Sequence, residues 1–382
     1  MTQDKIPFNR PYLTGSELDY ILTAQAKGQL AGDGQFTKLC HQWLEAWANS
    51  SKALLTHSCT AALEMSALLL DIHPGDEIIM PSYTFVSTAN AFVLRGGVPV
   101  FVDIREDTLN IDERLIESAI TSRTKAIVPV HYAGVSCEMD EIMAIAKRYE
   151  LAVIEDAAQG AMAYYKDRPL GGLGALGCLS FHETKNVISG EGGALLVNDP
   201  GFAARAEIIR EKGTDRGRYF RGEVDKYTWQ EVGSSYLPGE LIAAFLWAQL
   251  QHAGEITEQR LAIWDEYHAR LAPLEDKGLL RRPIIPSSCR HNAHMYYVLV
   301  APGADRQLVL QILRRDGIMP TFHYVPLHSS PAGARYGREH GSLARTSDLS
   351  ARVLRLPLWV GLGSDDLDRI VYALDQALTS SH

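Results

Sequence analysis

A lysine inside a glycine-rich stretch is the first candidate for covalent chemistry in this sequence. Lys185 follows the apolar segment 177–181, and a glycine cluster follows it at 190–193. An amine placed directly after a buried strand can be desolvated, which lowers its pKa and makes it a nucleophile. Ser180, which precedes this lysine, could bind a phosphate. A solvated surface lysine is the alternative, and the GxxxxGK[ST] spacing of a Walker-type phosphate loop is absent.

Two neighbouring carboxylates stand at the end of another apolar segment. Glu155 and Asp156 follow residues 151–154 directly. A carboxylate at the carboxyl end of a strand could act as a base, bind a metal ion, or pair with a cationic ring nitrogen. It could also simply cap the next helix. The residues alone do not separate these roles.

Two further segments end in polar or aromatic residues where a strand should stop. In the first, Ser58, Cys59 and Thr60 start a helix whose free N–H groups and dipole would bind a phosphate, although an ordinary helix cap fits as well. In the second, residues 81–88, Phe85 could stack on a flat ring or be a plain core residue.

The order of these four segments is more specific than any one of them. A phosphate-binding turn, an aromatic residue, a strand-end aspartate and a glycine-flanked lysine follow one another as a pyridoxal 5′-phosphate (PLP) site requires. We therefore predict a PLP enzyme in which Lys185 holds the cofactor as a Schiff base. Asp156 would pair with the pyridine nitrogen of the cofactor.

The surrounding pattern predicts an α/β fold. Short apolar runs alternate with stretches of helical periodicity such as 59–70, 86–95 and 139–149, which indicates a mostly parallel sheet with helices on both faces. Ligands of such sheets bind beyond the carboxyl ends of the strands. The seven predicted strands are 52–56, 77–80, 98–102, 125–130, 151–154, 177–181 and 193–197.

The pattern of predicted helices and strands changes near residue 250. Predicted helices at 251–274, 305–316 and 364–378 surround one predicted strand at 295–300. A chain of 382 residues also exceeds the size of one ordinary core. We predict a large cofactor-binding domain over 1–250 and a smaller α+β domain over 251–382.

Composition excludes several classes of partner. The net charge of −9 argues against binding to nucleic acid, and neither an export signal nor a membrane span is predicted. The five cysteines show no CxxC spacing, so no metal site or disulfide framework is expected. Together these features predict a cytoplasmic protein.

Several segments resemble the sugar aminotransferases of the DegT/DnrJ/EryC1/StrS family, over nearly the whole chain. The resemblance implies a PLP fold of the aspartate-aminotransferase type, fold type I, and a homodimer whose active sites form across the subunit interface. The segments that carry it are Ile6-Pro7-Phe8 with Arg10-Pro11, Gly28–Gly32, Ser58–Leu63, Pro81–Phe85, Glu155–Gly160, Ser180–Asn186 with Gly190–Gly193, and His323–His328.

The resemblance also assigns roles to residues around the cofactor. It places Gln159 near the ring oxygen and Phe85 against the ring, with Thr60, Ser180 and the Ser58–Cys59 turn at the phosphate. The amine would pass from L-glutamate to the 4-keto carbon of a nucleotide-linked 6-deoxyhexose. Many relatives carry Asn-Tyr-Arg where this chain reads Ser234-Ser235-Tyr236-Leu237, so Ser235 would replace the Asn that reaches the neighbouring subunit's phosphate group.

Substrate contacts are expected from two later segments. His323, Tyr324 and His328 could bind the sugar or the donor carboxylate, and Lys212 and Tyr227 lie in a basic, aromatic segment that suits a nucleotide diphosphate. A structural role is the alternative for each.

Three alternative functions would each require different residues from those in the sequence. A sugar dehydratase of the same family would carry histidine in place of Lys185, and a non-catalytic regulatory protein would have a broken site. A dinucleotide-dependent oxidoreductase needs GxGxxG after the first strand, but no glycine follows Thr56 there.

Overall fold

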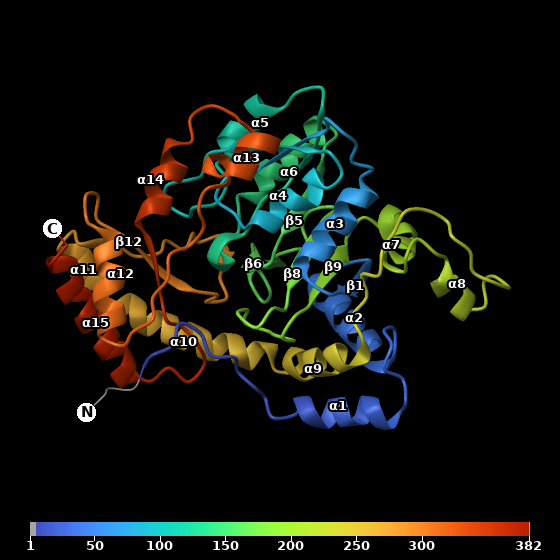
Figure 1. Cartoon of the computed structure of the whole chain (residues 1–382), viewed down its shortest axis with the longest axis horizontal. Coiled ribbons are helices and arrows are strands. Elements are labelled where there is room, and N and C mark those ends of the chain that lie inside the picture. The colour runs from blue at the N-terminus through green and yellow to red at the C-terminus, as the bar shows by residue number, and fades with distance from the viewer. Residues whose placement is uncertain (1–4, 382) are drawn as a thin grey trace.

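The central feature of the molecule is one large, mostly parallel sheet (Figure 1). The computed structural model describes residues 5–381. Strand β9 runs antiparallel to both of its neighbours, and all other adjacent pairs are parallel. In spatial order the strands are β1 (Lys52–Thr56), β9 (Gly193–Val197), β8 (Leu176–Ser180), β5 (Ala152–Asp156), β4 (Thr124–Ile127), β2 (Glu77–Pro81), β3 (Val98–Val102) and β13 (Arg338–Glu339).

The sheet has eight strands, so the predicted number of seven is wrong by one edge strand. β13 consists of only Arg338 and Glu339 and pairs with Val100 and Phe101 of β3. Two charged residues give no apolar strand pattern, because such a pattern reports burial and β13 lies at the exposed edge. The Arg338 guanidinium instead binds the buried Glu77 of β2 at 2.8 Å.

Helices cover both faces of the large sheet, as the alternation of the strands predicts. Ala53 and Leu55 of β1 face one core, which α2 (Gln35–Ala48), α6 (Met139–Arg148) and α9 (Glu240–Gln251) complete. Leu54 faces the opposite core, under α3 (Cys59–Leu69), α4 (Val86–Val93) and α7 (Ala203–Arg210). Side chains that alternate between two cores explain why these strands read as continuous apolar runs.

The C-terminal part packs a second, smaller sheet against helices. Its strands lie in the order β10 (Leu280–Arg281), β12 (Tyr296–Val300) and β14 (Val353–Leu356), all antiparallel. The helix predicted over 251–274 starts two residues later and ends earlier, as α10 (Ala253–Arg270), followed by the separate α11 (Ala272–Asp276). α12 (Arg306–Arg315) and α15 (Ser364–Thr379) cover the same core.

The first described residues pack into this smaller core beside the C-terminal helix α15. Ile6 is buried there and its backbone pairs with Ile318. The N-terminal segment thus lies beside the C-terminal part in space, and the domain boundary near residue 250 stays a prediction.

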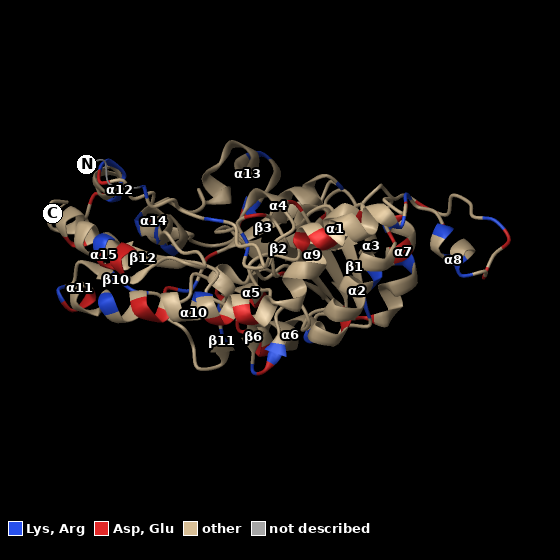
Figure 2. Ribbon diagram, turned by 90° about the horizontal axis from the view of Figure 1, so that it is seen from below, with Lys and Arg blue, Asp and Glu red and all other residues tan. Residues whose placement is uncertain are grey.

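The remaining elements are short or peripheral. Figures 1 and 2 both show α8 and its loops projecting from the rest of the molecule. Figure 2 also shows charged residues on the outer helices and loops. No helix of residues 5–381 is long and apolar enough to cross a membrane. These elements are α1 (Glu17–Ala26), α5 (Ile116–Ala119), α8 (Arg216–Phe220), α13 (Pro331–Tyr336), α14 (Ala344–Arg352), β6 (Tyr164–Tyr165), β7 (Arg168–Pro169) and β11 (Cys289–Arg290).

Candidate active site

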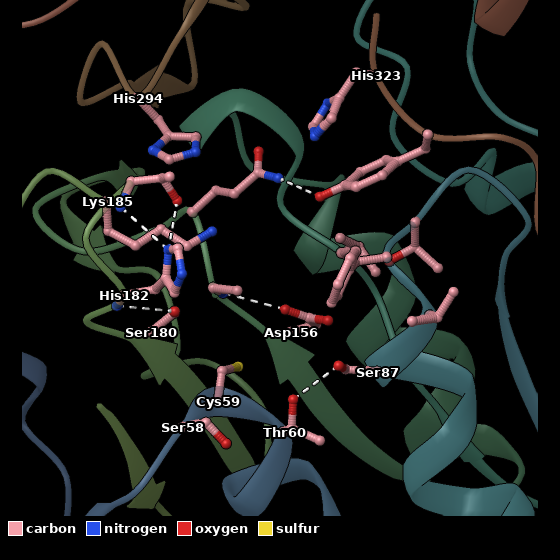
Figure 3. Close-up of a pocket in the computed structure, with 18 of the residues that line it drawn as sticks. Ser58, Cys59, Thr60, Ser87, Asp156, Ser180, His182, Lys185, His294 and His323 are labelled. Atoms are coloured by element: carbon pink, nitrogen blue, oxygen red, sulfur yellow. Dashed lines mark hydrogen bonds between the residues drawn. The ribbon is translucent and has the colours of Figure 1, made fainter. Parts of the chain in front are cut away.

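A cavity of about 760 Å³ lies beyond the carboxyl ends of the sheet strands (Figure 3). It is lined by the segments that follow β1 and β2, by Asp156 of β5 and Ser180 of β8, and by the segment 322–325 from the C-terminal part. Ten predicted site residues meet there although they are far apart in the sequence. They are Ser58, Cys59, Thr60, Phe85, Asp156, Gln159, Ser180, Lys185, His323 and Tyr324.

Lys185 places an amine without a partner in this cavity. Within the described part of the chain its Nζ makes no hydrogen bond or ion pair, while its backbone N–H donates to the carbonyl of His182 at 2.8 Å. Burial lowers the pKa of Lys185, and the positive charge of Arg355 adds to this effect, whereas Cys59 and Asp156 oppose it. A larger fraction of this amine is therefore neutral and nucleophilic than of an ordinary lysine.

Asp156 ends β5 with its carboxylate facing the cavity. Its Oδ2 accepts a hydrogen bond from the Thr88 hydroxyl at 2.7 Å, and its Oδ1 accepts one from the Ala158 N–H at 3.1 Å. Burial nevertheless raises the pKa of this carboxyl above its usual range. A cation beside it would offset that cost, which suits a carboxylate that pairs with a ring nitrogen.

The neighbouring carboxylate serves the fold instead. Because side chains alternate along a strand, Glu155 points to the other face of the sheet, where it is fully buried. Its oxygens accept hydrogen bonds from the backbone of Gly171, Leu173 and Gly174, and one pairs with His131 Nε2 at 2.9 Å. The structure thus separates two residues that the sequence leaves equivalent.

The start of α3 forms the opposite end of the cavity. Ser58 caps the helix by accepting from the Ala61 N–H at 3.1 Å, and the Thr60 hydroxyl donates to Ser87 Oγ at 2.7 Å. The N–H groups of Cys59 and Thr60 have no acceptor among the described residues. Free amides at the positive end of an 11-residue helix form an anion site.

One glycine allows this helix start to approach the sheet. A Cβ atom on Gly193 of β9 would lie 2.3 Å from the carbonyl carbon of Ser58 and 2.4 Å from the Cys59 nitrogen. Real atoms do not approach so closely, so any side chain there would push the start of α3 away. The glycine cluster after Lys185 therefore shapes the anion site as well.

The wall between the Lys185 end and the α3 end of the cavity is lined by Gln159, Tyr324 and Phe85. Gln159 is fixed by two bonds: its Oε1 accepts from the Ala133 N–H at 2.6 Å and its Nε2 donates to Tyr324 Oη at 2.9 Å. The Phe85 ring lies 6.2 Å from the Tyr324 ring. Phe85 is 56% exposed despite its apolar side chain, which leaves a ring face open for stacking.

Four of the predicted residues lie away from the cavity. The His328 ring bonds to the Ser82 hydroxyl at 2.7 Å, which indicates a structural role within this chain. Lys212, Tyr227 and Ser235 lie on either side of α8 in the sequence and do not line the cavity. Their predicted roles at a substrate or at a neighbouring subunit stay predictions.

The structure also brings in residues that the sequence did not single out. Thr88 holds Asp156, and His294 and Arg355 line the cavity from the C-terminal part. Thr88 stands one turn into the helix after Phe85, a spacing that could have suggested it. No local pattern marks His294 or Arg355, because only the tertiary fold brings them to the sheet.

These groups fit PLP on three counts. The unpartnered amides at the start of α3 suit a phosphate, the buried Asp156 suits a pyridinium, and the unpaired Lys185 amine suits an aldehyde. All three line one cavity large enough for the cofactor and part of a substrate.

Comparison with known proteins places this arrangement in a family. A model of the DegT/DnrJ/EryC1/StrS aminotransferase family matches residues 11–375. The chain belongs to that family.

Individual relatives agree over almost the whole length. GDP-perosamine synthase of Caulobacter vibrioides is 33% identical over 378 residues, which covers 98% of each chain. The spore coat polysaccharide biosynthesis protein SpsC of Bacillus subtilis is 32% identical, covering 97% of this chain and 96% of its own. The solved structure of DesV of S. venezuelae is 30% identical with a TM-score of 0.89 and covers 98% of this chain and 99% of that one.

Family membership establishes the cofactor and the type of reaction. The chain is a PLP-dependent nucleotide-sugar aminotransferase with a fold of PLP type I, which confirms the predicted fold, cofactor and enzyme class. The same fold occurs in the sugar aminotransferase Spr1654 of Streptococcus pneumoniae, solved in PLP and PMP forms, at 24% identity and a TM-score of 0.91 over 99% of this chain and 100% of that one. An NAD-type oxidoreductase is thereby excluded.

Proposed function

We propose that this enzyme transfers the amino group of L-glutamate to the 4-keto carbon of a dTDP-4-keto-6-deoxyhexose, which gives dTDP-4-amino-4,6-dideoxygalactose. The observation that carries the proposal is the meeting of Lys185 and Asp156 in one cavity with the anion site of α3. The finer choice of sugar rests on the resemblance of three segments to an enzyme that makes this product: Phe181–Asn186, Arg210–Thr214 and Asp225–Trp229.

Each predicted cofactor-site residue has one task in this proposal. Thr60, Ser180 and the amides of Cys59 and Thr60 bind the phosphate of PLP, Phe85 stacks on its ring, and Gln159 contacts the ring oxygen. Asp156 keeps the ring nitrogen protonated, and PLP when bound supplies the electron sink. Ser58 fixes the phosphate turn by capping α3.

Lys185 carries the proton transfers. Its Nζ takes the proton from Cα of the donor amino acid in the first half of the reaction. It returns a proton to C4 of the sugar in the second. Burial suits this task because it lowers the pKa of Lys185, so the free amine is available as a base.

The wall from the C-terminal part is proposed to bind substrate. His323 Nδ1 pairs with the Tyr132 hydroxyl at 2.9 Å, and its ring stacks on Tyr324 at 3.6 Å between centroids. Both side chains are thereby held at the cavity wall. Lys212 and Tyr227 would meet the nucleotide, and His328 would support the same loop from outside the cavity.

A homodimer completes the proposal. The projecting segment 212–235 is rich in exposed aromatic side chains, with Phe220 69% exposed and Trp229 79% exposed. Apolar patches of this kind mark interfaces. In a dimer, Ser235 at the base of this segment would reach the partner's cofactor phosphate. The predicted location in the cytoplasm agrees with PLP and sugar nucleotides as soluble ligands.

An assay with dTDP-4-keto-6-deoxyglucose and L-glutamate tests the proposal. Formation of dTDP-4-amino-4,6-dideoxygalactose, identified by its stereochemistry, is the expected result. A product with the gluco configuration at C4, or no turnover with this substrate, would contradict it. Turnover of a 3-keto sugar nucleotide instead would favour a 3-aminotransferase of the family, and no turnover with any keto sugar nucleotide would favour a regulatory protein that keeps the fold.

A further inference from the structure

His294 is a buried histidine in the cavity wall to which the proposed cofactor site gives no task. It lies shortly before β12 and lines the cavity, although only 6% of the residue is exposed. Figure 3 shows its ring on the Lys185 side of the cavity, away from Thr60 and Ser87. The hydrogen bonds of such a buried ring show which groups it can still bind.

The backbone of His294 is held from both sides. Its N–H donates to Oδ1 of Asn292 at 3.0 Å, and its carbonyl accepts from the Arg260 guanidinium at 2.9 Å. Asn292 is itself fixed, because its Nδ2 donates to the carbonyls of Gln159 and Ala161 at 2.8 and 2.7 Å. The ring is therefore presented to the cavity by a rigid loop.

Asn186, the residue after Lys185, determines which ring nitrogen of His294 carries the proton. Its Nδ2 donates to the backbone carbonyl of Asn292 at 2.6 Å, which sets the orientation of the amide because a carbonyl only accepts. The Asn186 Oδ1 then faces Nδ1 of His294 at 3.2 Å and accepts its proton. A neutral ring carries one proton, so Nε2 is left as an acceptor.

The ring of His294 stays neutral at neutral pH. Burial lowers the pKa of His294 well below its usual value, and the positive charges of Lys185, Arg355 and Arg260 act in the same direction. Within residues 5–381 its Nε2 has no hydrogen-bond partner. The cavity wall thus holds an acceptor that lacks a donor.

Lys185 can supply that donor. Its Nζ also makes no hydrogen bond or ion pair among the described residues. In the proposed reaction this amine is bound to PLP at rest and becomes free when the donor amino acid takes its place. A free amine brings N–H groups into a buried cavity, where they cost free energy unless an acceptor meets them.

We propose that His294 is a positioning residue whose Nε2 accepts a hydrogen bond from the Lys185 amine once PLP has released it. The bond aims the amine at Cα of the amino-acid donor. The ring keeps its Nδ1 proton and takes none from Lys185, so it orients the base without acting as one. The inference rests on the proposed function, because only a lysine that leaves the cofactor needs this acceptor.

Two amide variants separate this role from a structural one. His294→Gln places an amide oxygen near the position of Nε2 and can still accept from Lys185, but it loses the bond to Asn186. His294→Asn places its amide near Nδ1, so it keeps the bond to Asn186 and has no acceptor for Lys185. The control His252→Gln changes a partly exposed histidine that pairs with Glu255 and does not line the cavity.

The first measurement is the rate at which L-glutamate, with protium or deuterium on Cα, bleaches the cofactor band. We expect His294→Asn to slow bleaching by about tenfold to a hundredfold, the cost of one hydrogen bond to a charged group, and His294→Gln by less than about threefold. The deuterium isotope effect should grow in His294→Asn, because proton transfer becomes slower. The resting band, the unfolding temperature, the Kd of PLP and the KM of the sugar nucleotide should stay near wild type, and His252→Gln should resemble wild type throughout.

The second measurement does not depend on the donor. Nitrogen-15 NMR of His294 is compared between protein loaded with PLP and protein loaded with pyridoxamine 5′-phosphate (PMP), which leaves Lys185 free. Loss of the signal in His294→Gln identifies it. We expect the Nδ1–H tautomer in both forms, and an Nε2 signal that moves upfield with PMP in wild type but not in Lys185→Ala.

Three results would overturn the assignment. Wild-type bleaching in His294→Asn, or better rates with Asn than with Gln, would leave His294 a structural residue. A raised sugar-nucleotide KM with unchanged bleaching would give its ring to a sugar hydroxyl. The same Nε2 signal in PMP-loaded wild type and Lys185→Ala would exclude the hydrogen bond. Failure of the proposed function is separate: L-glutamate would then not bleach wild type, while the NMR comparison would still test His294.

Discussion

At the scale of single residues, burial acts in opposite directions on the two charges that matter most. It raises the pKa of Asp156 and lowers that of Lys185, so each charged form is destabilised until a partner arrives. We propose that for Asp156 this partner is the ring nitrogen of PLP. Asp156→Asn keeps the shape but not the charge.

We expect Asp156→Asn to retain PLP and to slow its reaction with L-glutamate by roughly 10²-fold or more, the usual cost of losing a preorganised charge at a reacting centre. Stopped-flow absorbance of the cofactor measures this rate. A wild-type rate in a variant that retains PLP would contradict the role of Asp156.

Thr88 should set the pH dependence through Asp156. Its hydroxyl bonds to the ionised carboxylate and so holds the pKa of Asp156 down against burial. Thr88→Val removes that bond, which raises the pKa further, so the protonated and inactive form appears at higher pH. The acid limb of the pH–rate profile should move up by about 1 to 2 pH units.

A matched variant is available one turn earlier. Thr84 Oγ1 lies 2.7 Å from Thr88 Oγ1 but has no bond to Asp156, so Thr84→Val should move the acid limb by much less. Equal shifts in the two variants, or a shift of Thr88→Val to lower pH, would show that this hydroxyl chain does not control the aspartate.

The residue types of the site are predictable from the sequence, but some of their roles are not. Four strand-end segments in a fixed order are enough to indicate PLP. Glu155 and Asp156 stay equivalent, because the sequence does not say which face of the strand meets the cavity. Arg355 escapes prediction because a lone arginine in an apolar strand resembles an edge residue until the fold shows what it faces.

At the scale of elements, the contact between β9 and the start of α3 decides the shape of the anion site. Gly193→Ala would force a Cβ against the backbone of Ser58 and Cys59. We expect the Kd of PLP to rise by about tenfold or more and the unfolding temperature to fall, because overpacking costs about 1–3 kcal/mol.

Gly254 gives the control for this prediction. It lies in α10, where an added Cβ meets no atom within 4 Å, and alanine favours helix. Gly254→Ala should bind PLP as wild type does and be at least as stable. Normal PLP affinity in Gly193→Ala would mean that the start of α3 is not the phosphate site.

The ion pair between the edge strand β13 and Glu77 should make the stability of the fold depend on pH in the acid range. The Arg338 guanidinium, with Thr121 and Arg123, holds the pKa of the buried Glu77 at about 2, below its ordinary 4.5. Since the folded value is the lower one, this stabilisation is complete above about pH 4.5 and is lost as the pH falls toward 2.

Glu77→Gln cannot titrate and should therefore lose less stability than wild type between these pH values. Its unfolding temperature should be lower than that of wild type at pH 7 and approach it in acid. Glu106→Gln, which alters an exposed carboxylate, is the control. Parallel curves for Glu77→Gln and wild type would show that Glu77 does not fasten the C-terminal edge strand.

Element positions are largely predictable where burial is continuous. The predicted runs 52–56, 98–102 and 193–197 match β1, β3 and β9. The eighth strand escapes prediction because two charged residues at an edge are held by an ion pair rather than by burial. The break at Leu271 escapes it because α10 and α11 both bury apolar residues, so that 251–274 reads as one helix.

At the scale of the whole molecule, the projecting segment around α8 should govern assembly. Phe220 and Trp229 are too exposed to stabilise a monomer, so we expect Phe220→Ala with Trp229→Ala to weaken dimers and leave the fold intact. Sedimentation velocity over a range of concentrations measures this. The control Tyr372→Ala removes an aromatic that is 69% exposed on α15 instead.

A dimer that persists in the double variant would contradict the role of this segment as the dimer interface. A wild type that stays monomeric at high concentration would contradict the dimer itself. In the second case the roles proposed for Ser235, Lys212 and Tyr227 would fall with it, because none of these residues lines the cavity of its own chain.

The whole proposed reaction depends on Lys185, which we propose is the amine that holds PLP and moves the proton. The most direct test is the visible absorbance of PLP-loaded protein before and after L-glutamate, in wild type and in Lys185→Ala. We expect a visible cofactor band that L-glutamate bleaches in wild type, and no normal band in the variant. The same band and the same bleaching in Lys185→Ala would contradict this role of Lys185.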